Sequence, residues 1–191
     1  MRAPPYPYIF ALGAAGLVAG LAASPVAAQQ TAASSPEAVA RQYIATLTAG
    51  NYAATAALMH PSALASIRRF IIAVAGRDPS GAALSQFAGV SDTAALRALP
   101  DTEMYARFLK ATFAAQPVLG DAMKSATGSV IGHLDEGPDR TYVLYRLTMT
   151  IEGAEMKKVD VLTLQRSGTQ WKAMLAADIE NLIARLSTPA K

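Results

Sequence analysis

The architecture follows from residues 128–177, which read GSVIGHLDEGPDRTYVLYRLTMTIEGAEMKKVDVLTLQRSGTQWKAMLAA. Turn-forming residues at 135–139, 152–155 and 167–168 divide this stretch into four segments, and apolar residues recur at every second position within them. A period of two is typical of strands, and short turns join neighbouring strands in antiparallel pairs. The pattern predicts a four-stranded antiparallel meander with strands at 128–134, 141–151, 156–166 and 170–176.

The residues ahead of the meander carry helix signals. Ser34 and Glu37 match a capping box, apolar residues then recur at helical spacing as far as Leu47, and Gly50 is placed to end this helix. Asn51 is placed to cap a second, short helix at 52–59, which the pair His60 and Pro61 would stop. The fold class predicted is therefore α+β, with N-terminal helices packed on a curved meander.

Further helices are expected before and after the meander. A third helix is predicted from Ser62 to Gly76, a fourth from about Asp101 to Gln116, and a short closing helix from Ile179 to Leu186. The segment 77–99 contains a turn at 78–81 and a potential helix cap at Asp92. We predict that this segment is a lid-like insertion with one or two helical turns, because long connections are often functional.

The first 28 residues have the composition of a secretory signal peptide. Arg2 precedes an uncharged apolar run at 9–23, and Val26-Ala27-Ala28 supplies small residues for cleavage. At about 1.5 Å per residue this run is short for a hydrocarbon core of roughly 30 Å, so an uncleaved anchor is the lesser alternative. We predict cleavage after Ala28, a disordered lead at 29–34, one domain at 35–187, and a periplasmic or secreted location without stable membrane insertion.

Charge and cysteine content exclude several classes of protein. The chain has 17 basic and 14 acidic residues, and loss of Arg2 with the signal lowers the formal charge from +3 to +2. Basic residues occur at most in pairs, Arg68-Arg69 and Lys157-Lys158, without interleaved aromatic residues, so no nucleic-acid partner is expected and both pairs are expected on solvated surface. The chain has no cysteine, which excludes disulfides and thiolate chemistry.

Both faces of the second predicted strand carry large apolar side chains. Val143, Tyr145 and Leu147 lie on one face, and Tyr142 and Leu144 lie on the other. One face is expected to pack on the helices. The other is too apolar for bare solvent, which favours a homodimer through the sheet.

The order of elements resembles that of the nuclear transport factor 2-like superfamily. The resemblance rests on the capped first helix, the second helix that begins Asn51-Tyr52 and ends Met59-His60-Pro61, and a meander whose last strand carries Gln170-Trp171-Lys172. It implies a cone-shaped α+β fold with a cavity between the sheet and the first helices, and dimers through the open face of the sheet. The acidic base and phenol donor of the isomerases in that superfamily have no matching positions here, and fold alone assigns no function.

Few side chains are candidates for chemistry. The two histidines, His60 and His133, have no metal-binding spacing, so neither a metal nor another cofactor is expected. His60 is expected to bond backbone at a helix end, whereas His133 points either to solvent or into the cone. Asp160, flanked by valines, is either a general base with a raised pKa or the partner of a cation such as Arg146.

The aromatic side chains supply the candidate ligand site. They are either the wall of an apolar cavity or simply core: Tyr43, Tyr105, Phe108, Tyr145 and Trp171. Two functions remain open. One is an exported domain that binds a small apolar ligand without catalysis. The other is a cofactor-independent isomerase or dehydratase with Asp160 or His133 as base and Tyr105 or Tyr145 as donor.

Overall fold

The computed structural model describes residues 35–78, 80–176, 179–181 and 183. The predicted signal peptide, the lead at 29–34 and half of the predicted closing helix lie outside the described residues. Of that closing helix, residues 179–181 and 183 are helical.

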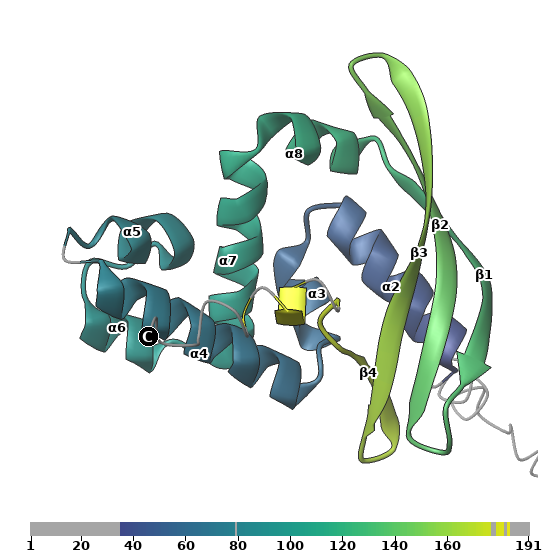
Figure 1. The fold of residues 1–191 in the computed structure, drawn as a ribbon, viewed down its shortest axis with the longest axis horizontal. Coiled ribbons are helices and arrows are strands. Elements are labelled where there is room, and N and C mark those ends of the chain that lie inside the picture. Colours follow the sequence, from purple (N-terminus) through teal and green to yellow (C-terminus); the bar gives the residue numbers. More distant parts are fainter. Residues whose placement is uncertain (1–34, 79, 177–178, 182, 184–191) are drawn as a thin grey trace, which may run out of the picture.

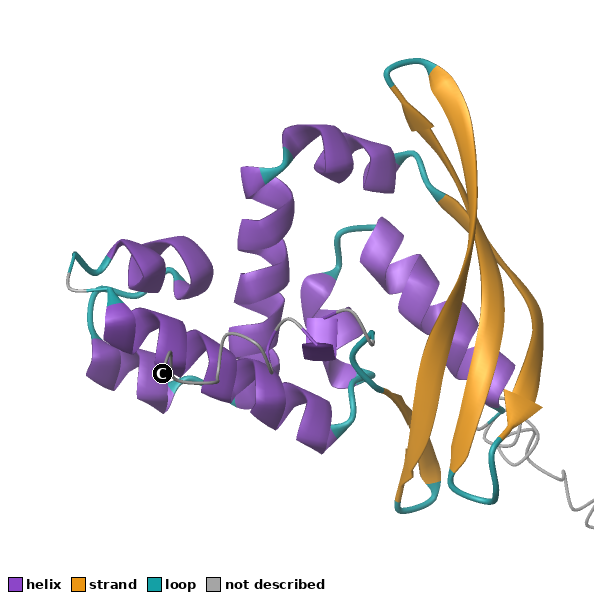
Figure 2. Ribbon diagram, in the orientation of Figure 1, coloured by secondary structure: helices purple, strands orange, loops and turns teal. Residues whose placement is uncertain are grey.

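The described chain is α+β, with seven named helices followed by a four-stranded sheet (Figures 1 and 2). The helices are α2 (Pro36–Thr48), α3 (Tyr52–Ala57), α4 (Pro61–Arg77), α5 (Ala82–Ala88), α6 (Thr93–Ala98), α7 (Asp101–Ala115) and α8 (Pro117–Lys124). The strands are β1 (Thr127–Asp135), β2 (Arg140–Ile151), β3 (Ala154–Ser167) and β4 (Gln170–Ala173). Consecutive strands pair antiparallel in the order β1-β2-β3-β4, which confirms the predicted meander.

Local capping explains where the first two helices begin. The cap of α2 is Ser35 and not Ser34, because the Ser35 hydroxyl accepts a hydrogen bond from the N–H of Ala38 at 3.2 Å and Pro36 takes the first helical position. Gly50 follows α2 with a φ of +68°, a left-handed conformation that favours glycine. Asn51 caps α3 as predicted, by accepting from the N–H of Ala54 at 3.2 Å.

The His60 ring bonds backbone at a helix end as predicted, but the predicted start of the third helix is corrected. This residue caps α4, which begins at Pro61 and not at Ser62, because the His60 ring nitrogen Nδ1 accepts a hydrogen bond from the N–H of Ser62 at 3.2 Å. The ring does bond backbone at a helix end, as expected, but at the start of the following helix. At the other end α4 continues through Gly76 to Arg77.

The segment 77–99 forms two helices that pack on α4 and α7. Asp92 caps α6 through the N–H of Ala95 at 2.8 Å, and Leu96 is fully buried. Arg68 of α4 ties this region down by donating to the carbonyl oxygens of Arg97 and Leu99 and to the carboxylate of Asp101. Arg68 is therefore a structural tether, which corrects its expected place on solvated surface.

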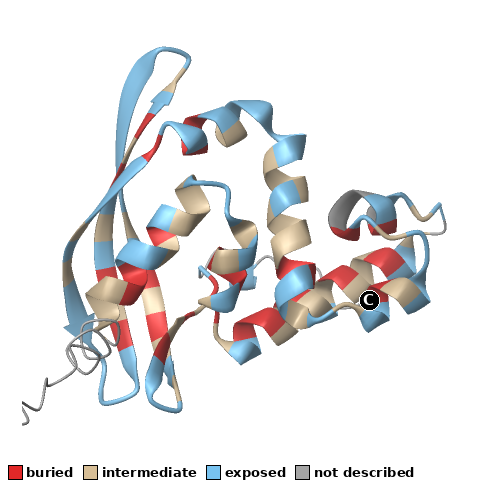
Figure 3. Cartoon of the chain, turned by 180° about the vertical axis from the view of Figure 1, so that it is seen from behind, coloured by how far each residue is buried: buried red, intermediate tan, exposed pale blue. Residues whose placement is uncertain are grey.

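The helices all lie on one side of the sheet within the described residues (Figure 1). The largest core cluster joins α2, α4, α6 and α7 to the inner face of the sheet through residues such as Ile67, Leu96, Met104, Val143 and Leu164. A second cluster joins Ile44 of α2 to Ala122, Ala126, Leu147 and Met149. Buried segments thus concentrate where α2 meets the strands and among α4 to α7 (Figure 3).

Candidate functional site

Asp160 lies on the side of the sheet that the helices cover. It is in phase with the buried residues Leu162 and Leu164, and it pairs directly opposite Tyr145 of β2. Its partner is Lys158, whose Nζ lies 2.6 Å from Asp160 Oδ2. Arg146, the partner considered from the sequence, is in register with Val159 and so lies on the opposite face.

The ionisation of Asp160 follows from these neighbours. Burial raises the pKa of Asp160. The hydrogen bonds from Lys158 and from the N–H of Val161 at 2.9 Å, together with the charge of Lys158, lower this pKa by more than burial raises it. The net result is a pKa below the ordinary value for an aspartate. Asp160 is therefore an ionised carboxylate at neutral pH and a weak base.

Three of the predicted pocket residues form a group, here called the tyrosine cluster: Tyr43, Tyr105 and Tyr145. Burial raises the pKa of Tyr145, and the charge of Asp160 and the Tyr43 hydroxyl add to this effect. Burial also raises the pKa of Tyr43 and of Tyr105, whose hydroxyls share a hydrogen bond. That bond lowers the pKa of Tyr43 and raises that of Tyr105, as expected if Tyr105 is the donor.

The other two predicted pocket residues make different contacts within the same core. The Phe108 ring packs edge-on against Phe70, with ring centroids 6.3 Å apart. Trp171 is buried, and the Arg166 guanidinium lies 4.4 Å from its ring centroid. Whether these five residues bind a ligand stays a prediction.

His133 joins β1 to the first turn of α2. Its Nδ1 forms an ion pair with Glu37 when the ring is protonated, and its Nε2 lies 3.7 Å from Asp135 Oδ2. A register shift between Val130 and Gly132 places His133 opposite Val143, on the inner face. Within the described chain, no three His, Asp or Glu side chains lie close enough to share a metal ion.

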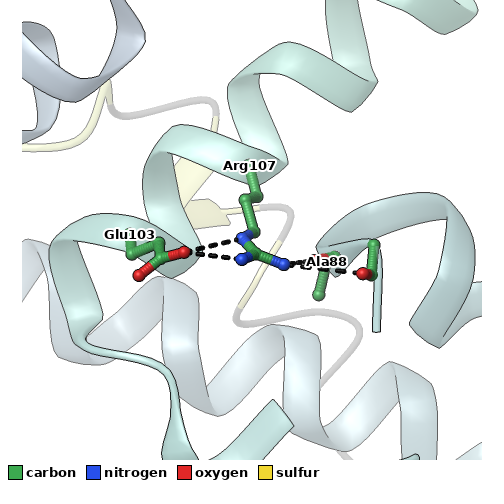
Figure 4. A network of polar contacts seen from close by, with 4 residues as sticks. Ala88, Glu103 and Arg107 are labelled. Atoms are coloured by element: carbon green, nitrogen blue, oxygen red, sulfur yellow. Dashed lines mark hydrogen bonds and ion pairs between the residues drawn. The ribbon is translucent and has the colours of Figure 1, made fainter. Parts of the chain in front are cut away.

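A cleft between α5 and α7 was not anticipated from the sequence. It has a volume of about 360 Å³, and Ala88, Gly89, Ala111 and Ala114 supply most of its wall. Arg107 borders it and is fixed by two bonds to Glu103, at 3.1 and 2.6 Å, and by one to the carbonyl of Ala88 at 2.9 Å (Figure 4). The Glu103–Arg107 spacing of four residues was the sequence signal for the ion pair, but nothing in the sequence placed α5 opposite it.

The outer face of the sheet carries a surface that we call the outer apolar patch: Leu134, Leu144, Val159 and Val161. Their exposed fractions are 67%, 37%, 54% and 46%. Leu144 and Val161 are direct cross-strand neighbours, and no helix of the described chain covers this face (Figure 1). Arg146 lies beside the patch and makes no hydrogen bond or ion pair with the described residues.

Comparison with protein-family models, with curated proteins and with solved structures finds no match for this chain. None of the described helices has the length and apolar character needed to cross a membrane.

Proposed function

We propose that this protein is an exported binding module for a small apolar molecule, and that the cleft between α5 and α7 is its binding site. The observation that carries the proposal is the cleft itself, because its volume of about 360 Å³ falls in the range of small-molecule sites and four of its seven described lining residues are alanine or glycine. Its position beside 77–99 agrees with the functional role that the length of this segment suggests.

The alternative, an acid–base enzyme, has less support. A general base at neutral pH works best with a pKa near 7, and the Lys158 ammonium holds the pKa of Asp160 low. The other candidate base, His133, is engaged with Glu37 and ties β1 to α2.

A titration with apolar probes tests the binding proposal. Native mass spectrometry of the exported protein identifies a co-purified ligand, and calorimetry then gives its affinity. Ala111→Phe fills the cleft and should weaken binding by about tenfold or more. Ala45→Phe, at an exposed position of α2, is the matched control. Equal affinities for Ala111→Phe and the wild type would place the ligand elsewhere and reject the cleft.

Membership of the nuclear transport factor 2-like superfamily is part of the same proposal. Its support is the order of elements, with α2 and α3 ahead of a four-stranded antiparallel meander. Export to the periplasm or medium is supported by the sequence of residues 1–28. N-terminal sequencing of the exported protein should begin at Gln29, and a chain that retains Met1 would contradict cleavage.

We also propose that a second copy of the chain covers the outer apolar patch. The patch is supported as an interface by its four exposed aliphatic side chains and by the neighbouring Arg146, since arginine is enriched at interfaces. Light scattering at micromolar concentration should give twice the mass of one chain, and Val161→Glu should reduce it to one. A wild-type mass of one chain would reject the dimer.

A further inference from the structure

Two hollows lie side by side on α7. The first is the cleft between α5 and α7. The second has a volume of about 300 Å³ and lies among α3, α7 and α8. Both hollows include Lys110 and Ala114. On α7 the first also uses Arg107 and Ala111 and the second uses Phe113, so they occupy adjacent stripes of the helix. Lys110 and Ala114 therefore form the ridge between the two hollows.

The ridge is low and positively charged. Ala114 raises it by only a methyl group, and both of its residues are exposed. Lys110 makes no hydrogen bond or ion pair with any described residue. The other cations that line the hollows are neutralised, because Arg107 pairs with Glu103 at 2.6 Å and Lys124 pairs with Asp121 at 2.8 Å. Lys110 therefore offers an uncompensated positive charge to an anion lying across the ridge.

The two hollows differ in the chemistry of their walls. The first is lined mainly by small aliphatic residues, such as Ala88 and Ala111. The second contains Tyr52 stacked on Phe113, with ring centroids 5.6 Å apart and planes 9° apart. Gly120 lets α8 approach α7 at this end, because a Cβ there would lie 2.9 Å from the Phe113 carbonyl oxygen. The first hollow fits an aliphatic chain, and the second fits a planar ring.

We propose that the ligand is a carboxylate with one aliphatic and one aromatic arm, as in an N-acylated aromatic amino acid. Its carboxylate pairs with Lys110, the aliphatic arm lies between α5 and α7, and the ring lies beside Tyr52 and Phe113. This inference rests on the proposed function and deepens it by naming the ligand class.

Three probes test the inference by calorimetry on the exported protein: octanoate, 3-phenylpropanoate and N-octanoyl-phenylalanine. N-octanoyl-phenylalanine spans the ridge. Its affinity should be higher than that of either other probe by about tenfold or more, because its two arms belong to one molecule and the second arm binds without a separate association step. Its methyl ester lacks the negative charge and should lose about tenfold in affinity.

Substitutions on the ridge separate charge from shape. Lys110→Met should weaken the binding of the spanning probe, whereas Lys110→Arg should bind it with the wild-type affinity. Ala114→Leu raises the ridge, so it should weaken the binding of the spanning probe more than the binding of octanoate. Lys157→Met, at an exposed lysine far along the chain, is the matched control and should change nothing. Circular dichroism checks that each variant is folded.

The outcomes distinguish the two proposals. If octanoate binds and Ala111→Phe abolishes this, but the spanning probe binds no tighter than octanoate, the binding module stands and the two-armed ligand is wrong. If the ester binds as tightly as the acid, the role of Lys110 is wrong. If none of the three probes binds and no ligand co-purifies, both proposals fail.

Discussion

Single residues decide which polar contacts the fold can hold, and His133 shows how one inserted residue changes them. Strict alternation from Val130 places His133 on the opposite face, but the register shift at Ile131 returns it to the inner face beside Glu37. Gly132 inside the strand was the local signal for a bulge, but a glycine alone does not fix where the extra residue lies. The sequence did predict that Asn51 and Asp92 cap helices, because a capping side chain bonds a backbone N–H within three residues of its own position.

Glu37 should make the stability of the protein dependent on acid pH. Its pKa is lowered by its own backbone N–H and, against an opposing effect of burial, by His133 and Ser35. A carboxylate with a lowered folded-state pKa stabilises the fold above its unfolded value of 4.5, and this contribution is lost as pH falls through the folded pKa. The unfolding free energy, measured with urea, should therefore fall more steeply below about pH 4.5 for the wild type than for Glu37→Gln.

The control for Glu37 is a carboxylate without an ion pair. Glu152→Gln fits, because Glu152 makes no ion pair or hydrogen bond with the described residues. This variant should follow the wild-type pH dependence. A parallel profile for Glu37→Gln as well would contradict the assigned role of Glu37.

The buried hydrogen bond between Tyr43 and Tyr105 should appear as a coupling energy. Tyr105→Phe leaves the Tyr43 hydroxyl without this partner and should cost about 1–2 kcal/mol of unfolding free energy. The double variant with Tyr43→Phe removes both polar groups and should cost less than the sum of the single changes. Urea denaturation of the four proteins measures this, and strict additivity would contradict the bond.

The positions of some helices depend on tertiary contacts that their own sequence patterns do not reveal. The strands were predicted within two residues at most of their ends, except that β4 ends at Ala173 and not at 176, because alternation and turns are local signals. The Asp92 cap predicted a short helix where α6 lies, but α5 was not predicted, because it has no side-chain cap and 77–99 has few large apolar residues to mark a buried face. Their places depend on tertiary contacts, such as Arg68 with the end of α6.

Gly128 should be essential for packing α2 on β1. A Cβ at this position would lie 2.2 Å from Cγ2 of Ile44, which is buried against Leu147. Gly128→Ala should therefore destabilise the protein by about 1–3 kcal/mol, the usual cost of overpacking. Gly132→Ala is the matched control in the same strand, because among the described residues no atom beyond Gly132 and its two chain neighbours lies within 4 Å of the added Cβ. Equal losses in the two variants would contradict the steric explanation.

At the scale of the whole molecule, the sequence predicted the order of the layers but not the hollows between the helices. The alternation of β2 predicted a buried and an unburied face, and the structure has both. The ridge at Lys110 could not be predicted, because its hollows depend on where α5, α3 and α8 lie against α7. A charged residue on one helix looks the same in the sequence whether its neighbours leave a hollow or fill it.

The helices and the sheet should unfold together. One core cluster includes Ile67 and Met104 of the helices with Leu164 and Trp171 of the sheet, and β4 also bonds to the end of α3 through the N–H of Ala173 and the carbonyl of Leu58 at 2.8 Å. Trp171 is the one tryptophan in the sequence, so its fluorescence reports on the sheet while far-ultraviolet circular dichroism reports mainly on the helices. Both probes should give the same urea midpoint.

Leu164→Ala should lower both midpoints together, at a cost of about 2–5 kcal/mol, because it opens a cavity in the shared core. Midpoints that separate in the wild type, or a variant that shifts only one of them, would show that the helices and the sheet are independent folding units.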